Sequence, residues 1–222
     1  MKKKSKSGDK DAKKQFNVME AVLNALKEGK PARIAKPDNE NKEDLKIFNM
    51  LGLLTSKPVL YACNVDESSA ASGNEFSQKV FAMAQKQGNL AVIISAEIES
   101  EVAVLSDKEE QKAFLETLGL QETGLAKVVR TGYQLLDLIT FFTAGPKEVK
   151  AWTLRKGSLA PQAAGVIHTD FEKGFIRSET ISYDDYIKYN GEQGTKEAGK
   201  MRLEGKSYEV KDGDVVHFLF NV

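Results

Sequence analysis

The chain has 222 residues, of which 41% are hydrophobic and 29% are charged, and its formal net charge is zero. This length allows one or two domains with packed cores, and the balanced charge argues against a protein that coats nucleic acid by bulk charge. The single cysteine excludes an internal disulfide, and no apolar run approaches the roughly 18–20 residues that span a bilayer. We therefore expect a cytoplasmic protein without a membrane contact, and a monomer.

The first 36 residues are basic, with eleven Lys or Arg against four Asp or Glu, a local net charge of about +7. Apolar side chains recur there at helical spacing, which predicts an amphipathic helix over residues 9–28. Gly29 and Pro31 are suitable to end this helix. A second short helix is predicted over residues 39–50.

Two continuous apolar runs follow, at residues 58–63 and 90–94. Runs without alternation are typical of strands that are covered on both faces, as in a parallel sheet. A helix predicted over residues 74–87 joins the two strands into a βαβ unit. Further helices are predicted at 107–118 and 122–137. These elements indicate an α/β domain, although two strands are too few for a complete sheet.

The pattern changes near residue 138 to that of a small α+β module. Strands are predicted at 138–143, 148–154 and 175–182, and helices at 160–171 and 183–189. The polar stretch 191–199 has the composition of a loop. Asp212-Gly213, which lies between two apolar runs at 208–210 and 215–220, predicts a β-hairpin.

Polar residues follow both strands of the βαβ unit, at the place where α/β sheets bind nucleotides. The first strand is followed by Asn64, Val65, Asp66 and Glu67, and the second by Ser95, Ala96 and Glu97. An Asn side chain offers one acceptor and two donors, and a carboxylate three residues later can accept from the N–H groups of a base. By spacing alone, however, such stretches are more often an Asx turn and an ordinary helix start.

Longer motifs resemble one protein family. KPVLYACNVDE at residues 57–67 and ISAEIE at residues 94–99 resemble the last two base-recognition motifs of YchF-type (Obg-like) P-loop NTPases. The C-terminal runs FFTAG, KEVKAWT, VIHTDFEKGFIR and DGDVVHF are similar to the TGS domain that closes these proteins. The resemblance covers nearly the whole chain, and the long C-terminal motif is highly specific.

The resemblance implies three parts. Residues 1–49 would be a remnant of the helical (coiled-coil) arm, residues 50–137 the C-terminal part of a P-loop G-domain with a parallel sheet, and residues 138–222 a β-grasp TGS domain. The implied parent function is the binding and hydrolysis of ATP or GTP, coupled to binding of the ribosome or its RNA. In this chain Asn64, Val65, Asp66 and Glu67 would lie on one side of the base and Ser95, Ala96 and Glu97 on the other, and none of them is catalytic.

Two departures from the family pattern matter. Val65 replaces the lysine, and Glu67 the aspartate, of the Asn-Lys-x-Asp motif of guanine-specific GTPases, so we expect adenine to be tolerated or preferred. No Gly-x-x-x-x-Gly-Lys-Ser/Thr loop occurs in the sequence, although this loop cradles the phosphates and holds Mg²⁺. The Mg²⁺-binding aspartate is missing too, so no metal ligands are predicted. We therefore expect this chain alone to bind nucleotide weakly or not at all, and not to hydrolyse it.

Two alternatives remain open. The chain could be a non-catalytic module that binds RNA or the ribosome, with the partial G-domain as a scaffold, or an unstable partial protein without activity. A basic surface on the C-terminal module would favour the RNA alternative, whereas an ordinary solvated face is the simpler explanation for these residues: Lys147, Lys150, Arg155, Lys156, Lys173 and Arg177. Cys63 ends an apolar strand and is interpreted as a buried structural thiol rather than a redox switch. His168 and His217 are interpreted as structural or partner-facing, because neither has a Cys or a second His nearby at metal-binding spacing.

Overall fold

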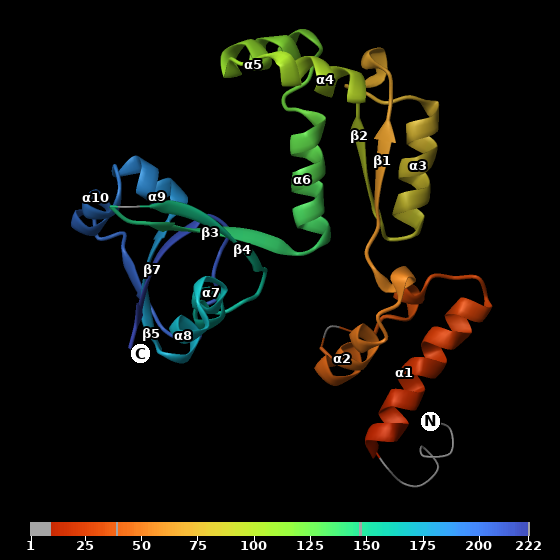
Figure 1. The fold of residues 1–222 in the computed structure, drawn as a ribbon, viewed down its shortest axis with the longest axis horizontal. Coiled ribbons are helices and arrows are strands. Elements are labelled where there is room, and N and C mark those ends of the chain that lie inside the picture. Colours follow the sequence, from red (N-terminus) through yellow and green to blue (C-terminus); the bar gives the residue numbers. More distant parts are fainter. Residues whose placement is uncertain (1–9, 39, 147, 222) are drawn as a thin grey trace. The chain divides into compact units, whose positions relative to one another are not determined.

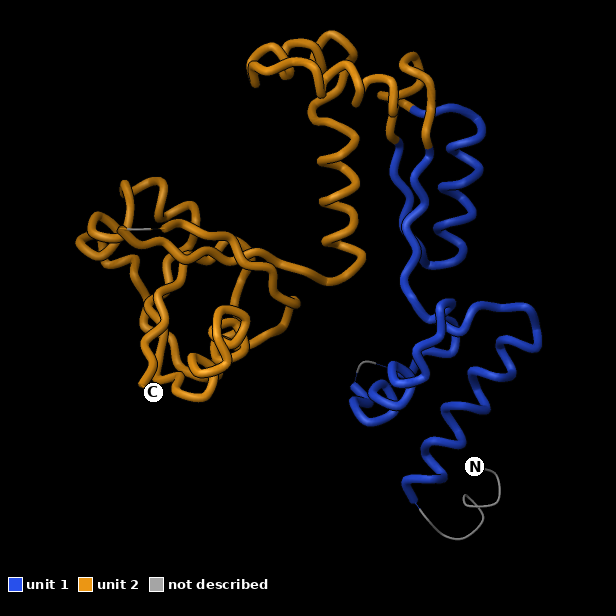
Figure 2. Tube along the Cα trace, in the orientation of Figure 1, with its two compact units in different colours: residues 1–63, 73–93 blue, residues 64–72, 94–222 orange. Residues whose placement is uncertain are grey.

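The computed structural model describes residues 10–38, 40–146 and 148–221, which are drawn as a ribbon in Figure 1. The chain divides into two compact units. The first comprises the residues up to 63 together with 73–93, and the second comprises 64–72 and 94–222 (Figure 2). All seven residues of the predicted base site therefore fall within the second unit.

Two helices and two short 3-10 turns begin the first unit. Their bounds are α1 Lys10–Lys27, η1 Ala32–Ala35, α2 Lys42–Met50 and η2 Leu54–Ser56. The apolar positions of α1, four residues apart, bury Val18 and Val22 in a cluster with Ala32 and Phe48. The two helices predicted for this segment are confirmed.

A βαβ unit follows. β1 (Leu60–Asn64) and β2 (Leu90–Ile94) are hydrogen-bonded neighbours in a two-stranded sheet, and they run in the same direction, with α3 (Glu75–Lys86) between them in the chain (Figure 1). Asn74 and Ser77 form a capping box that starts α3. The strand, helix and strand predicted here are confirmed.

Three helices continue the chain in the second unit: α4 Ala96–Val104, α5 Lys108–Thr117 and α6 Gly124–Leu135. The buried side chains of α4 and α5 form one cluster with Ala70 and Leu120. α5 and α6 confirm the predicted helices. The sequence pattern does not predict α4, because its first turn is polar and it buries only Ile98 and Val102.

The C-terminal part is built on a five-stranded mixed sheet in the order β4–β3–β7–β5–β6. The strands are β3 Leu138–Ala144, β4 Val149–Arg155, β5 Phe175–Ser182, β6 Arg202–Glu204 and β7 Asp214–Phe220. β3 and β7 are parallel, and the other neighbours are antiparallel. Phe141 and Phe218 on one face of the sheet pack in a core with Ala163 and Ala164 of α7 (Ala160–Ile167). A mixed sheet around one central helix is the β-grasp arrangement that the resemblance implied (Figure 1).

The predicted β-hairpin around Asp212-Gly213 is wrong. Residues 208–210 form no strand, although the structure describes all three of them. The Thr140 N–H donates to Asp212 Oδ1 at 2.7 Å, and the Gly213 N–H donates to the Thr140 carbonyl at 2.8 Å. The turn is thus bonded to β3, so β7 continues between β3 and β5 instead of folding back on the residues before it.

Three smaller differences also have local causes. The predicted loop 191–199 contains α10 (Glu192–Glu197), which the fully buried Thr195 anchors. The predicted helix 160–171 is two helices, α7 and α8 (Thr169–Lys173), because His168 between them is extended, with φ −158°. β6 is missing from the predicted elements because three residues are too few for a recognisable pattern.

The remaining elements match their predictions. β3, β4 and β5 confirm the predicted strands, and α9 (Tyr183–Lys188) confirms the predicted short helix. The domain boundaries after residues 49 and 137 stay predictions. Among the described residues, no helix combines the length and the hydropathy that a membrane crossing requires.

Candidate functional site

The carboxyl ends of β1 and β2 lie side by side. The Val65 N–H donates to the Ile94 carbonyl at 2.9 Å, which extends the pairing beyond the end of β1. A second bond joins the two ends through a side chain, since the Ala96 N–H donates to Asn64 Oδ1 at 2.9 Å. The structure therefore brings together the two polar stretches that the sequence predicted as one site.

The Asn64 side chain is the link between these stretches. Its residue is exposed, and its carbonyl oxygen is committed to Ala96. This bond assigns the orientation of the amide, because the N–H of Ala96 needs an acceptor. The amide nitrogen Nδ2 is left with two donors for a ligand that presents acceptor atoms.

The two carboxylates after β1 differ in what they contact. Asp66 accepts from the Ser69 N–H and from the Ser68 hydroxyl, each at 2.9 Å. These bonds, that from Ser69 first, lower the pKa of Asp66. Asp66 thereby caps the 3-10 turn η3 (Glu67–Ser69) as an Asx turn. The Glu67 side chain is exposed and has no hydrogen bond or ion pair with any described residue, so its carboxylate is the free acceptor.

Two of the predicted site residues face the interior. Val65 is 8% exposed and Ser95 is 4% exposed. The structure therefore leaves only the backbone of Val65 available at the surface of the site. The Ser95 hydroxyl is buried and finds no hydrogen-bond partner among the described residues. It contributes no side-chain cap to α4, although Ser95 is the N-cap residue.

The first turn of α4 supplies further donors. Ala96 gives its N–H to Asn64, whereas the N–H groups of Glu97 and Ile98 belong to the helix start and have no partner within the helix. They lie at the positive end of the helix dipole, which favours an acceptor atom near the start of α4. The Glu97 side chain is exposed at the same edge.

One residue that positions this edge is not predicted from the sequence. Glu99 accepts from the Gly124 N–H at 2.6 Å and from the Leu125 N–H at 3.1 Å, so it ties α4 to the first turn of α6. Gly124 packs so closely that a Cβ there would lie 3.0 Å from Glu99 Oε1. No local sequence pattern predicts this contact, because Glu99 and Gly124 are 25 residues apart in the chain.

The geometry suits the edge of a nucleobase better than a chain of phosphates. Donors come from Asn64 Nδ2 and the start of α4, and an acceptor comes from Glu67, which together complement a base edge. Phosphates would meet the unpaired carboxylates of Glu67 and Glu97. Within the described residues, no group of three or more His, Cys, Asp or Glu side chains is placed to hold a metal ion.

Two of the basic residues of the C-terminal module, Arg155 and Arg177, lie far apart on its sheet. Lys147 lies outside the described residues. Arg155 is opposite Leu138 at the start of β3, and Arg177 is opposite Leu219 near the end of β7. Since β3 and β7 are parallel, the two arginines lie toward opposite ends of the sheet. These two arginines therefore do not form one basic face for RNA.

The other singled-out residues have structural contacts. His168 Nδ1 accepts from the Asp170 N–H at 3.2 Å and so caps α8. His217 is exposed on β7, opposite Glu179. Cys63 is half-buried in β1, and burial raises the pKa of its thiol, which disfavours the reactive thiolate form.

Comparison with known families gives one match to the C-terminal part. Residues 138–221 match the family model YchF-GTPase_C, which is described as a protein of unknown function (DUF933).

Curated proteins are similar along the whole chain. The "Ribosome-binding ATPase YchF" of Haemophilus influenzae is 51% identical over 222 residues, which cover 100% of this chain and 60% of the relative. Proteins of the same name from Escherichia coli O157:H7 and Bacillus subtilis are 51% and 48% identical, over 99% of this chain and 59% and 60% of those proteins. The chain thus spans about 60% of the length of these relatives and aligns with their carboxy-terminal part.

Solved structures show the same likeness. The YchF GTPase of Schizosaccharomyces pombe matches with a TM-score of 0.79 and 36% identity, over 93% of this chain and 55% of that chain. A GTP-binding protein from Pyrococcus horikoshii OT3 matches with a TM-score of 0.55 and 21% identity, over 93% of this chain and 56% of that chain, and shows a shared fold only.

Proposed function

The chain belongs to the YchF family and corresponds to its carboxy-terminal part, and we propose that it supplies the base-recognition edge of a ribosome-associated ATP- or GTP-hydrolysing protein. The observation that carries the proposal is the bond from the Ala96 N–H to Asn64 Oδ1. It joins two polar stretches at the carboxyl edge of a βαβ unit, where nucleotides bind in α/β sheets. The relatives' name, ribosome-binding ATPase, supports the nucleotide and the partner.

Adenine fits this edge better than guanine. Guanine presents an acceptor, O6, where adenine presents a donor, the 6-amino group. The Ala96 N–H, which could serve O6, is already bonded to Asn64. The free Glu67 carboxylate is an acceptor that a 6-amino group can use. We therefore propose ATP as the preferred nucleotide and GTP as a weaker one.

Hydrolysis requires groups beyond this edge. Phosphoryl transfer depends on a loop that cradles the phosphates and on a bound Mg²⁺ that neutralises the developing charge. The sequence of this chain contains no such loop. Its own residues can hold and orient the base, and we propose that this chain alone does not hydrolyse ATP.

The C-terminal module completes the proposal. Its β-grasp sheet and its match at residues 138–221 support a TGS domain over residues 138–222. Residues 1–49 would be part of the helical arm and 50–137 the end of the G-domain. Ribosome binding by the relatives supports a cytoplasmic location and the ribosome as partner. We propose that the chain is monomeric.

Nuclear magnetic resonance can test where a base binds. Adenosine added to the ¹⁵N-labelled chain should shift the amide signals of residues 64–67 and 95–97, and guanosine should shift them less. Asn64→Asp should abolish the shifts, because Asp keeps the acceptor for Ala96 but loses the donors. Asn74→Asp, at the cap of α3, is the matched control and should bind as the parent does. Shifts confined to other residues, or none at all, would refute the base site.

The alternative of a non-catalytic ribosome-binding module is favoured by the missing phosphate loop. Sedimentation with purified ribosomes, without nucleotide, separates the two proposals. Binding that falls steeply as salt rises, and that adenosine and ATP leave unchanged, would support the alternative. Binding that depends on nucleotide would support the base-recognition proposal.

A further inference from the structure

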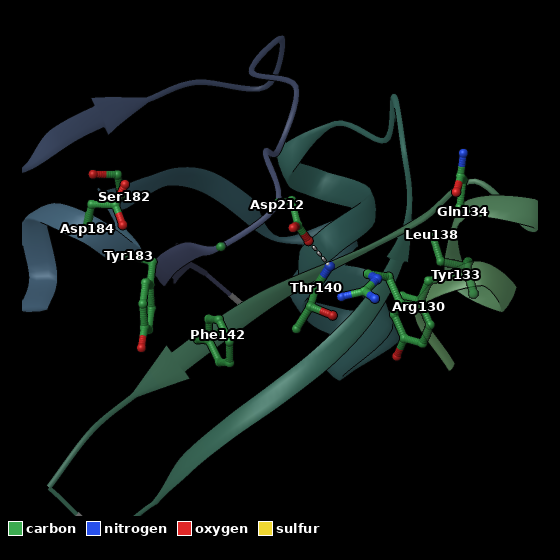
Figure 3. Close-up of a pocket in the computed structure, with 11 residues that line it drawn as sticks. Arg130, Tyr133, Gln134, Leu138, Thr140, Phe142, Ser182, Tyr183, Asp184 and Asp212 are labelled. Carbon is green, nitrogen blue, oxygen red and sulfur yellow. Dashed lines mark hydrogen bonds between the residues drawn. The ribbon is translucent and has the colours of Figure 1, made fainter. Parts of the chain in front are cut away.

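An open pocket lies in the second unit. It has a volume of about 770 Å³ and is lined by the second half of α6, by β3, by the corner where β5 meets α9, and by the turn at 212–213 (Figure 3). None of the seven predicted base-site residues lines it. Its volume falls in the range of about 300–1,000 Å³ that is typical of ligand pockets.

Aromatic rings form one side of this pocket. The rings of Phe142 and Tyr183 lie with their centres 6.0 Å apart and tilted by 37°. Figure 3 shows them beside each other, with Arg130 reaching in from α6. Tyr183 is 50% exposed, so much of its ring is accessible to a ligand. Exposed aromatic faces attract cations.

The charges around the pocket favour a cation as well. Its only cationic side chain among the described lining residues, Arg130, forms an ion pair with Glu122. Two carboxylates line the pocket, those of Asp184 and Asp212. Asp212 already accepts from the Thr140 N–H, whereas Asp184 is exposed and makes no hydrogen bond or ion pair with a described residue. The pocket therefore offers aromatic faces and one unpaired carboxylate.

The walls of the pocket are held in place. The 212–213 turn is fixed to Thr140 by two hydrogen bonds, and the residues before it are held by a bond from the Tyr208 hydroxyl to Asp214 at 2.7 Å. A Cβ at Gly213 would lie 3.3 Å from the Tyr183 Cβ, so the turn and the aromatic wall are in close contact. A ligand would meet a pocket that is already formed.

We propose that this pocket binds an arginine or lysine side chain on an extended segment of a partner protein. The cationic head would lie against Phe142 and Tyr183 and pair with Asp184. The volume has room for this side chain and for neighbouring backbone. A nucleic-acid strand fits less well, because its phosphates would approach two carboxylates while the one guanidinium is already paired. The proposal does not depend on nucleotide binding.

The test uses three probes on the ¹⁵N-labelled full chain: the peptide acetyl-Gly-Arg-Gly-amide, the same peptide with neutral citrulline in place of arginine, and AMP. The arginine peptide should shift the amide signals of Phe142, Tyr183 and Gly213 in a saturable manner, and the citrulline peptide should not. Asp184→Asn should weaken arginine-peptide binding by about fivefold, the upper end for an exposed charge pair. Asp170→Asn, an exposed acid on α8, is the matched control and should leave it unchanged.

Four results would overturn the proposal. These are equal shifts of the pocket amides with the arginine and citrulline peptides, unchanged affinity in Asp184→Asn, shifts of the pocket amides with AMP while the arginine peptide shifts none of them, and no shift of these amides with any probe. The AMP result would assign the pocket to nucleic acid instead. The amide spectrum of each variant shows directly whether it is folded, and base binding at residues 64–67 is read in the same spectra, so the two sites are tested separately.

Discussion

The Asn64 side chain divides two tasks between its polar atoms. Oδ1 holds the Ala96 N–H, and Nδ2 stays available to a ligand. The hydrogen bond to Ala96 is already present in the protein without ligand, so it can be tested without any nucleotide. The second task is the proposed contact with the base.

We expect Asn64→Ala to lower the free energy of unfolding by about 1 kcal/mol, the usual net value of one hydrogen bond. The Ala96 amide should exchange its hydrogen faster, because it loses its acceptor. Asn64→Asp keeps an acceptor and should retain both stability and protection. Urea unfolding and amide exchange measure these effects, and unchanged protection of Ala96 in Asn64→Ala would show that the bond does not form in solution.

The raised pKa of Tyr208 predicts that the free energy of unfolding depends on pH. Burial first, and then its hydrogen bond to Asp214, raise the pKa of Tyr208 to about 12, from an ordinary value of 10.0. The folded state thus favours the neutral phenol, and this contribution is complete below pH 10 and is lost as the pH rises from 10 to 12. Tyr208→Phe should remove that part of the decline. The unfolding midpoints of the parent chain and of Tyr208→Phe, measured from pH 10 to 12, check this prediction. An equal loss of stability in both proteins would contradict it.

At this scale the polar stretches after the two apolar strands, together with the family resemblance, predicted Asn64 and Ala96 on two sides of one base site. The structure brings these two residues into direct contact, and their role toward a base stays a prediction. The inward positions of Val65 and Ser95, and the Asx turn that occupies Asp66, depend on three-dimensional contacts that spacing does not reveal. Glu99 is missed for the same reason.

At the start of α6, the first turn of this helix contacts Glu99 of α4. Gly124 is its first residue, and its backbone fits against Glu99 and Ile94. Gly132 lies in the same helix, and a Cβ there would have nothing within 4 Å. The two glycines therefore form a natural pair for comparison.

We expect Gly132→Ala to stabilise the protein by up to about 1 kcal/mol, because alanine is the better helix former. Gly124→Ala should instead destabilise it, since the new Cβ would push Glu99 off the first turn of α6. Chemical denaturation of both variants gives the comparison. Equal stabilisation by the two substitutions would mean that the contact between Glu99 and α6 has no energetic importance.

Long elements with clear periodicity were predictable, and short or contact-dependent ones were not. α1, α3 and β2 lie where the pattern puts them, because each has a run of apolar residues at one period. α10 is stabilised by one buried threonine, and the Asp212-Gly213 turn is bonded to a strand that precedes it by some 70 residues in the sequence. Local chemistry indicates a turn there but not which strand it joins.

For the chain as a whole, stability should be uneven. β1 and β2 form a two-stranded sheet, and α3 beside them exposes Phe76 to 75%. The five-stranded sheet buries a continuous core. A two-stranded sheet has little stability of its own. We therefore expect the amide hydrogens of β1 and β2 to exchange faster than those of β3, β5 and β7. Equal protection in native-state hydrogen exchange would contradict this.

The central claim is that this chain carries the base-recognition edge of a nucleotide site without the phosphate-binding loop. The most direct test is calorimetric titration of the chain with adenosine and with ATP under the same conditions, with Mg²⁺ present. We predict that ATP binds no more tightly than adenosine, because only the base would be held and the sequence contains no loop that cradles the phosphates. Much tighter binding of ATP than of adenosine would contradict the account, since it would require phosphate contacts that the sequence does not provide.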